Sequence, residues 1–340
     1  MHPRKKLLYL GNKLASHGAP PTSVDVLPIW LEQEGYGVVT ASSKKNKVLR
    51  LVDMLVCVIQ NRKRVDLVLI DTYSTQNFYY AVMVAGLCRV FKLPYIPILR
   101  GGDLPKRLKG NKAISKKLFG RAYTNIAPSL YIEHQFEAMG FGNIVYIPNT
   151  IALVDYPFLP RKVITCKLLW VRAFAEIYNP LLALEIVEAL QKEKVAVELC
   201  MVGPDKDGSL AACKKIVEQL DLPVTFPGLL SKQQWIALSK EYDIFINTTN
   251  FDNMPVSVME AMALGLPVIS TNVGGMPFLI EDGVDGVLVG GNDVGAFVDA
   301  IKDLIRSPLK VEKLTQNARD KMEFHDWEVV KEKWKEVLGE

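Results

Sequence analysis

The sequence predicts an α/β protein with two Rossmann-like, doubly wound parallel-sheet domains that face a cleft. Short apolar runs alternate with helical patterns along the whole chain, and the alternation restarts after a proline-bearing stretch at 148–160. Continuous Val, Ile and Leu runs separated by helices are typical of parallel strands covered on both faces. At 340 residues, the chain is also too long for one compact core and fits two domains.

The expected elements follow this alternation in order. The first domain should contain strands at 7–10, 37–40, 67–70, 95–99, 125–127 and 144–147. The second should contain strands at 168–171, 198–202, 224–226, 244–247, 268–270 and 286–289. The patterns between them predict helices, among them 179–192, 210–220, 232–240 and 293–305, and the apolar run 78–87 predicts a buried helix. Ligands are expected where the carboxyl ends of the strands face the cleft.

We expect three segments from this pattern. Residues 1–155 form the first domain, 156–322 form the second, and 323–340 form a terminal helix. The proline-bearing stretch between the domains is the expected hinge.

Charge is divided unevenly between the two halves. The first 150 residues hold 21 Lys and Arg against 9 Asp and Glu, and the rest of the chain holds 20 against 28. The densest basic run, 106–121, is punctuated by Leu108, Ile114, Leu118 and Phe119. It predicts a basic amphipathic helix on an anionic membrane surface, or else a solvated helix face that aids solubility. Nucleic acid is not an expected partner, because aromatic residues are not interleaved with the charges.

Cysteine usage and hydropathy predict a cytoplasmic protein, with possible attachment to the inner membrane face. The five cysteines form no C-x-x-C or metal-binding spacing, which is typical of core residues in a reducing compartment. The apolar run near the N-terminus is too short for a signal peptide, and no run approaches the length of a membrane span.

The most informative segment is 252–270, where two carboxylates, Asp252 and Glu260, bracket a helix start. Pro255 lies at the expected first helical position and Gly265 just past the helix end. A helix entered in this way directs the free N–H groups of Val256, Ser257 and Val258 toward a phosphate. Glu260, about two turns further in, could reach a sugar hydroxyl, so the segment predicts a nucleotide-sugar site.

This segment resembles the acid-x7-acid region of the retaining, Leloir-type glycosyltransferases of family 4, which have the GT-B fold. The stretch from Glu260 to Val268 matches the family pattern almost letter for letter. The first acid is Asp252 where the family has Glu, and Met254-Pro255 replaces a Phe-Gly step. The resemblance implies that Glu260 binds the ribose hydroxyls and that Asp252 contacts the transferred sugar.

The resemblance extends over nearly the whole chain. In the first domain, Gly11, Asn12 and Lys13 match the phosphate-proximal loop, and Asp103 follows a strand where it could bind hydroxyls. Thr150 stands where the family has a glycine. The terminal helix at 323–340 is implied to pack back on the first domain.

In the second domain the resemblance implies that Arg172 holds the diphosphate and that Gly203 lines the nucleotide pocket. The lysine that accompanies this arginine in the family is missing, and Tyr178 and Asn179 stand in its region. We suggest that Lys13 could compensate for the lost charge.

The implied activity is the retaining transfer of a hexose from a UDP- or GDP-linked donor to a lipid-linked or oligosaccharide acceptor, in surface polysaccharide synthesis. No cofactor besides the donor and no metal is expected, because guanidinium and helix N–H groups neutralise the leaving diphosphate. Two alternatives stay open. A nucleotide-sugar 2-epimerase shares the architecture and would need no acceptor. A non-catalytic partner subunit would account for the missing lysine and for the changes at Thr150 and Asp252.

Overall fold

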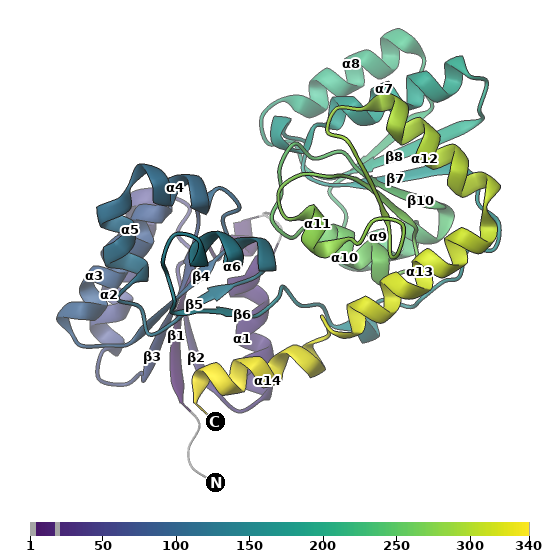
Figure 1. Cartoon of the computed structure of the whole chain (residues 1–340). Helices are drawn as coiled ribbons and strands as arrows, with labels where there is room; N and C mark the ends of the chain where they lie inside the picture. The colour runs from purple at the N-terminus through teal and green to yellow at the C-terminus, as the bar shows by residue number, and fades with distance from the viewer. Residues whose placement is uncertain (1–4, 18–20, 340) are drawn as a thin grey trace. The chain divides into compact units, whose positions relative to one another are not determined.

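The computed structural model of the protein describes residues 5–17 and 21–339. The chain divides into two compact units, one made of 1–148 with 333–340 and the other of 149–332. Each unit is built on a six-stranded parallel sheet, and Figure 1 shows helices on both faces of each sheet. The expected α/β class with two Rossmann-like domains is therefore confirmed.

The first unit has the strand order β2-β1-β3-β4-β5-β6. Its strands are β1 (Lys6–Leu10), β2 (Gly37–Ala41), β3 (Leu67–Thr72), β4 (Tyr95–Leu99), β5 (Asn125–Ala127) and β6 (Ile144–Tyr146). Its helices are η1 (Ala15–His17), α1 (Ser23–Gln33), α2 (Lys47–Asn61), α3 (Phe78–Val90), α4 (Leu104–Gly110), α5 (Lys112–Phe119) and α6 (Leu130–Glu137). The chain leaves β1 toward β2 and then crosses to β3 on the other side, so the switch point of this sheet lies at the carboxyl end of β1.

The second unit has the order β12-β11-β10-β7-β8-β9. Its strands are β7 (Cys166–Val171), β8 (Val197–Val202), β9 (Val224–Gly228), β10 (Ile244–Asn247), β11 (Val268–Thr271) and β12 (Val287–Val289). Its helical segments are η2 (Leu153–Asp155), η3 (Glu176–Tyr178), α7 (Pro180–Lys192), α8 (Ser209–Leu220), α9 (Lys232–Leu238), η4 (Ser239–Glu241), α10 (Val256–Ala263), α11 (Met276–Leu279), α12 (Val294–Arg306) and α13 (Pro308–Glu323). Here the switch point lies between β7 and β10.

Local signals explain where several helices begin. The side chain of Asn46 accepts from the Val48 N–H at 2.9 Å and caps α2, and Asp293 caps α12 by accepting from the Ala296 N–H at 2.9 Å. Such caps satisfy N–H groups that have no partner inside the helix. Each unit then buries its own apolar core between sheet and helices.

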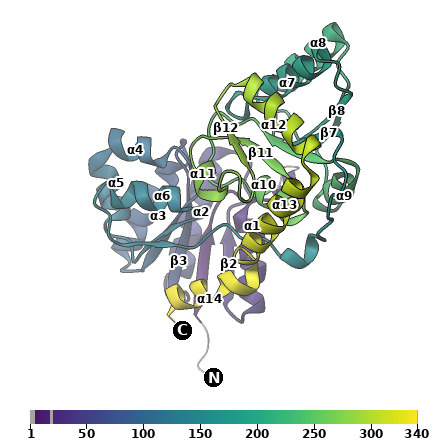
Figure 2. The same ribbon diagram turned by 45° about the vertical axis from the view of Figure 1, so that its right-hand side comes forward.

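The linker between the units is hydrogen-bonded to the second unit. The first unit therefore ends at residue 148, whereas the sequence suggested 155. The Ile151 N–H donates to the His325 carbonyl at 3.1 Å, and the Thr150 hydroxyl donates to the same oxygen at 2.7 Å. Helix α13 packs on α10, as Figure 2 shows.

Helix α14 (Trp327–Leu338) ends the described chain, and its residues from Lys333 onward group with the first unit. There Lys335 forms an ion pair with Glu34 at 3.1 Å.

The basic run 106–121 differs from its expected form. It folds as two short helices, α4 and α5, and Leu108, Leu118 and Phe119 point into the core of the first unit. The expected single amphipathic helix is therefore wrong for this segment, because Leu108, Leu118 and Phe119 are used in packing. Its contact with an anionic membrane surface stays a prediction. None of the described helices is long and apolar enough to cross a bilayer.

Candidate functional site

Arg172 follows directly on β7, at the switch point of the second sheet. Its N–H donates to the Val202 carbonyl at 3.0 Å, which holds it against the end of β8. The next residue of that strand end is Gly203, with φ +151°, where an added Cβ would lie 1.8 Å from the Arg172 carbonyl oxygen. Only glycine allows the two strand ends to approach this closely. This packing explains why residue 203 is glycine. The contact of Gly203 with a nucleotide stays a prediction.

The Arg172 guanidinium is held by two side chains, one from η3 and one from the loop after β10. It forms an ion pair with Asp252, and its Cζ lies 3.9 Å from the centroid of the Tyr178 ring. The arginine side chain is only 11% exposed, and its Nε is buried without a partner among the described residues. A stacked, paired guanidinium in a partly buried site keeps its orientation and still has N–H groups to offer a ligand.

Asp252 lies in the loop between β10 and α10. One of its carboxylate oxygens, Oδ1, accepts from the Asn253 N–H at 2.7 Å, and the other, Oδ2, pairs with Arg172. The loop is supported by the turn 272–275, whose Gly275 N–H donates to the Asp252 carbonyl at 2.8 Å. An added Cβ at Gly275 would lie 1.7 Å from the Asn253 carbonyl oxygen, so this close backbone contact requires glycine.

Helix α10 begins immediately after this loop. Pro255 is its N-cap residue, one position earlier than expected, and offers no side-chain cap to the N–H groups of Val256 and Ser257. The Ser257 hydroxyl is buried without a partner among the described residues. The first turn therefore presents uncapped donors, and the helix dipole favours an anion there.

Glu260 is 3% exposed and is held by two residues that the sequence analysis did not identify. The Tyr156 hydroxyl donates to its Oε1 at 2.7 Å, and Lys232 at the start of α9 forms an ion pair with the same oxygen. Burial raises the pKa of Tyr156, and the negative charge of Glu260 raises it further. Both contacts bring distant segments together, so no local pattern marks Tyr156 or Lys232.

Asn179 has a structural role beside the site. It adopts a left-handed conformation at the start of α7, and its side-chain amide donates to Asn292 Oδ1 at 2.7 Å and to Asn250 Oδ1 at 3.3 Å. These bonds tie together three loops at the carboxyl edge of the sheet. Of the expected pair Tyr178 and Asn179, it is the tyrosine that contacts Arg172.

The predicted residues of the first unit lie at the carboxyl ends of its strands. Asn12 accepts from Arg50 Nη1 at 3.1 Å, and Lys13 donates to the Thr40 hydroxyl at 2.9 Å. Asp103 is exposed at the start of α4. Asp103 and Lys13 belong to this unit, whereas Arg172 and Asp252 belong to the other.

A buried carboxylate that the sequence analysis missed, Asp71, lies beside Gly11. Its Oδ1 accepts from the Tyr9 hydroxyl at 2.8 Å and from Arg100 Nε at 3.3 Å. Burial raises the pKa of Asp71, while the positive charge of Arg100 opposes the shift. An added Cβ at Gly11 would lie 2.6 Å from Asp71 Oδ2, so a side chain at this position would collide with the carboxylate. The signal in the sequence is a charged residue inside the otherwise apolar β3.

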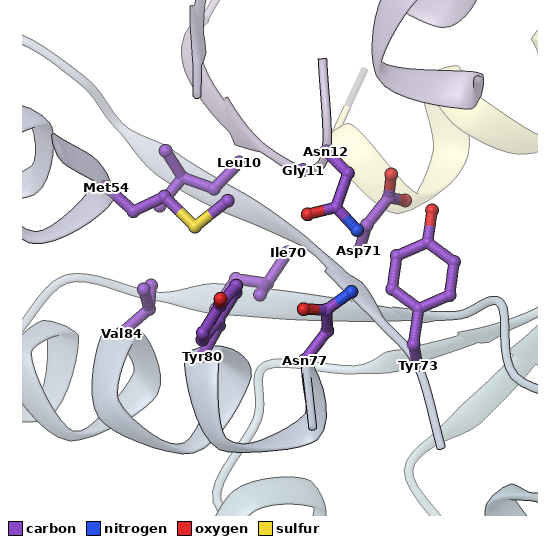
Figure 3. Close-up of a pocket in the computed structure, with 10 residues that line it drawn as sticks. All are labelled: Leu10, Gly11, Asn12, Met54, Ile70, Asp71, Tyr73, Asn77, Tyr80 and Val84. Atoms are coloured by element: carbon purple, nitrogen blue, oxygen red, sulfur yellow. The ribbon is translucent and has the colours of Figure 1, made fainter. Parts of the chain in front are cut away.

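Asp71 also lines a small pocket (Figure 3). The polar groups of Asn12, Asp71, Tyr73 and Asn77 lie on one side of the pocket, and Leu10, Met54, Ile70 and Val84 lie on the other. Within residues 5–17 and 21–339, no group of three or more His, Cys, Asp or Glu side chains is arranged to hold a metal ion. The expected independence of metal stays a prediction.

Comparison with known proteins agrees with this architecture. The fold is GT-B, like that of Anabaena HepE in complex with UDP-glucose, with a TM-score of 0.80, 17% identity and 98% and 99% of the two chains covered. Sucrose-phosphate synthase from Thermosynechococcus elongatus also has a TM-score of 0.80, with 16% identity and 98% of each chain covered. At these identities the likeness shows the fold.

Residues 165–321 match the family model described as Glycosyl transferases group 1. A D-inositol 3-phosphate glycosyltransferase of Mycobacterium tuberculosis is 30% identical over 139 residues, which cover 39% of this chain. The chain spans 29% of the length of that curated relative. The region matched by the family model contains Arg172, Lys232, Asp252 and Glu260.

Proposed function

We propose that the protein is a retaining glycosyltransferase of family 4 that moves a hexose from a UDP- or GDP-linked donor to an acceptor hydroxyl. The observation that carries this proposal is the arrangement at the carboxyl edge of the second sheet. Two cations, Arg172 and Lys232, and two carboxylates, Asp252 and Glu260, are ion-paired on either side of the uncapped start of α10. A nucleoside-diphosphate sugar carries both the anionic phosphates and the hydroxyls that such groups bind.

In the reaction, the bond between the anomeric carbon and the diphosphate oxygen breaks, and a bond to the acceptor oxygen forms on the same face of the sugar. The acceptor proton passes to the departing diphosphate. Arg172 and the N–H groups of Val256 and Ser257 stabilise the charge that develops on this leaving group. Asp252 orients hydroxyls of the transferred sugar, and Glu260 binds the ribose.

Lys232 replaces the lysine that the family pattern places after Arg172. Its side chain is 46% exposed whereas Glu260 is buried, so the lysine can move while the carboxylate stays in place. When ribose hydroxyls bind Glu260, the released ammonium group is free to pair with a phosphate of the same donor. This second cation weighs against a non-catalytic subunit, which needs no compensation for the lost charge.

The first unit is proposed to supply the acceptor side. Gly11, Asn12, Lys13 and Asp103 all lie at the carboxyl edge of its sheet, and the acceptor is proposed to be a lipid-linked or oligosaccharide glycan in surface polysaccharide synthesis. We propose that the enzyme works in the cytoplasm, at the inner face of a membrane, without a metal.

Calorimetric titration with UDP, GDP, ADP and their sugar conjugates, in the presence of EDTA, tests the donor site. We expect one nucleotide to bind in the micromolar range, which is about where substrate constants of enzymes lie. Glu260→Gln keeps an acceptor for Tyr156 but loses the charge, and it should weaken binding roughly 10- to 100-fold. Glu198→Gln, an exposed glutamate on β8, is the matched control. Unchanged affinity of Glu260→Gln would overturn the site assignment.

The same preparation separates the alternatives. Incubation with donor alone converts the sugar only in an epimerase, as NMR of the nucleotide sugar reveals. Nucleotide binding without transfer to any glycan acceptor or to water favours the non-catalytic subunit. In a transfer product, the anomeric coupling constant reports whether configuration is retained.

A further inference from the structure

Helix α2 exposes an apolar face to solvent. Its buried residues Arg50, Met54 and Val58 face the core of the first unit. On the opposite side lie five aliphatic side chains that are 41–69% exposed, namely Val48, Leu49, Val52, Val56 and Ile59. At 3.6 residues per turn these five lie within a sector of about 100°. The solvent side of a helix is ordinarily polar, so a continuous apolar stripe there indicates a contact surface.

Helix α3 extends this surface. It packs beside α2 (Figure 1), and the Tyr80 hydroxyl donates to the Lys47 carbonyl at 2.9 Å between them. Its outer side chains Tyr79, Met83 and Val90 are 44–73% exposed. The connections β2 to β3 and β3 to β4 run in the same direction across the sheet, so right-handed crossovers place both helices on the same face. We call these eight residues the α2–α3 apolar face.

Basic residues flank the face at both ends of α2. Lys44, Lys45 and Lys47 precede or begin the helix, and Arg62, Lys63 and Arg64 follow it, all of them exposed. Asp53 is the one acidic residue within α2. Further exposed lysines, Lys116 and Lys117, lie on α5, which packs against α3. The surface therefore combines exposed aliphatic side chains with a positively charged rim.

We propose that the α2–α3 apolar face docks on an anionic lipid bilayer. Its aliphatic side chains enter the interface between head groups and acyl chains, and the surrounding Lys and Arg side chains pair with lipid phosphates. A second copy of this chain fits less well, because two such faces would bring like-charged rims together. The docking is independent of the proposed donor chemistry. It replaces α4 and α5 as the main apolar contact, since Leu108, Leu118 and Phe119 are buried in the core of the first unit.

Flotation of the full-length protein with vesicles of phosphatidylcholine, with and without phosphatidylglycerol, tests the proposal. Wild type should float with the anionic vesicles and be released by salt. The partition coefficient of the triple variant Val48→Ser, Val52→Ser and Val56→Ser onto anionic vesicles should be lower than that of wild type by roughly tenfold or more, because three exposed apolar side chains are lost. The control variant Val154→Ser, Val163→Ser and Leu309→Ser removes three side chains that are 75–89% exposed in the second unit, and it should float like wild type.

Three results would overturn the proposal. The first is wild type that never floats, and the second is a triple serine variant that floats like wild type. The third is a dimer that light scattering detects for wild type and does not detect for the triple variant. That result would assign the face to a second copy of the chain. Nucleotide titration of the triple variant should match wild type, which shows that the fold is intact and keeps failure of docking distinct from failure of the donor site.

Discussion

At the scale of single residues, the candidate donor site consists of charges that hold one another in place. Arg172 is paired with Asp252 and stacked on Tyr178, and Glu260 is paired with Lys232. A partly buried charge is tolerated when it is paired and hydrogen-bonded. Such pairing fixes the side chains before a ligand arrives, and this preorganisation is what electrostatic stabilisation of a leaving group requires.

Tyr178 is the positioning residue whose effect is easiest to isolate. Replacing Tyr178 with Leu removes the aromatic face beneath the guanidinium, a contribution of about 1–2 kcal/mol in a partly desolvated site. We expect kcat to fall roughly tenfold with a smaller change in KM, because the proposed role of Arg172 is to stabilise the charge that develops on the leaving group. Tyr178→Phe keeps the ring and should retain most of the activity. Equal losses in both variants would mean that the hydroxyl, and not the stacking, is what matters.

At the scale of elements, helix α10 is fixed at its carboxyl end. The Leu266 N–H donates to the Ala261 carbonyl at 3.0 Å and the Gly265 N–H to the Met262 carbonyl at 3.2 Å, which together form a Schellman motif. Arg161 Nη1 donates to the carbonyls of Leu264 and Gly265 at 3.2 and 2.9 Å. These bonds hold the helix that carries Glu260.

The end of α10 offers a matched pair of glycine substitutions. Gly265 has φ +78°, and an added Cβ would lie 2.8 Å from the Leu159 carbonyl oxygen, whereas Gly283 has φ +72° with open space around it. Gly283→Ala should lower the free energy of unfolding by about 1–2 kcal/mol, because alanine is disfavoured in the left-handed conformation. Gly265→Ala should lower the free energy of unfolding by about 1–3 kcal/mol more, because its Cβ also overlaps the Leu159 carbonyl oxygen. Urea unfolding measures both, and equal costs would show that the backbone beside Gly265 moves away freely.

At the scale of the whole molecule, the chain forms two units with separate cores. Arg172, Lys232, Asp252 and Glu260 belong to the second unit, and the α2–α3 apolar face belongs to the first. Each unit therefore carries a proposed binding surface of its own, one for the donor and one for the membrane.

This division predicts an unequal response to nucleotide. A ligand that binds only the folded second unit stabilises it by about 2.7 kcal/mol at one hundred times its Kd. Hydrogen exchange should therefore slow in β7, α10 and the start of α9, while β1 and β3 of the first unit exchange as before. A nucleotide that protects both sheets equally would show that the units open together.

Much of the secondary structure was predictable because its signals are local. The expected strands at 95–99, 125–127 and 244–247 match β4, β5 and β10 to the residue, since short Val, Ile and Leu runs bounded by polar turns carry their own information. Gly265 marked the end of α10 for the same reason. The motif spacing also predicted the location of Asp252 in the loop before α10 and of Glu260 within that helix.

The contacts between distant segments could be seen in the tertiary structure and not in the sequence. Lys232 reaches Glu260 across 28 residues, Arg172 reaches Asp252 across 80, and Tyr156 reaches Glu260 across 104. The outer face of α2 belongs to the same class, because this helix carries apolar residues on two sides and only packing selects which side meets the sheet. Local sequence determines which elements form, through backbone preference and hydrophobic period. The partners of a side chain depend on strand order, which is set by burial over the whole chain.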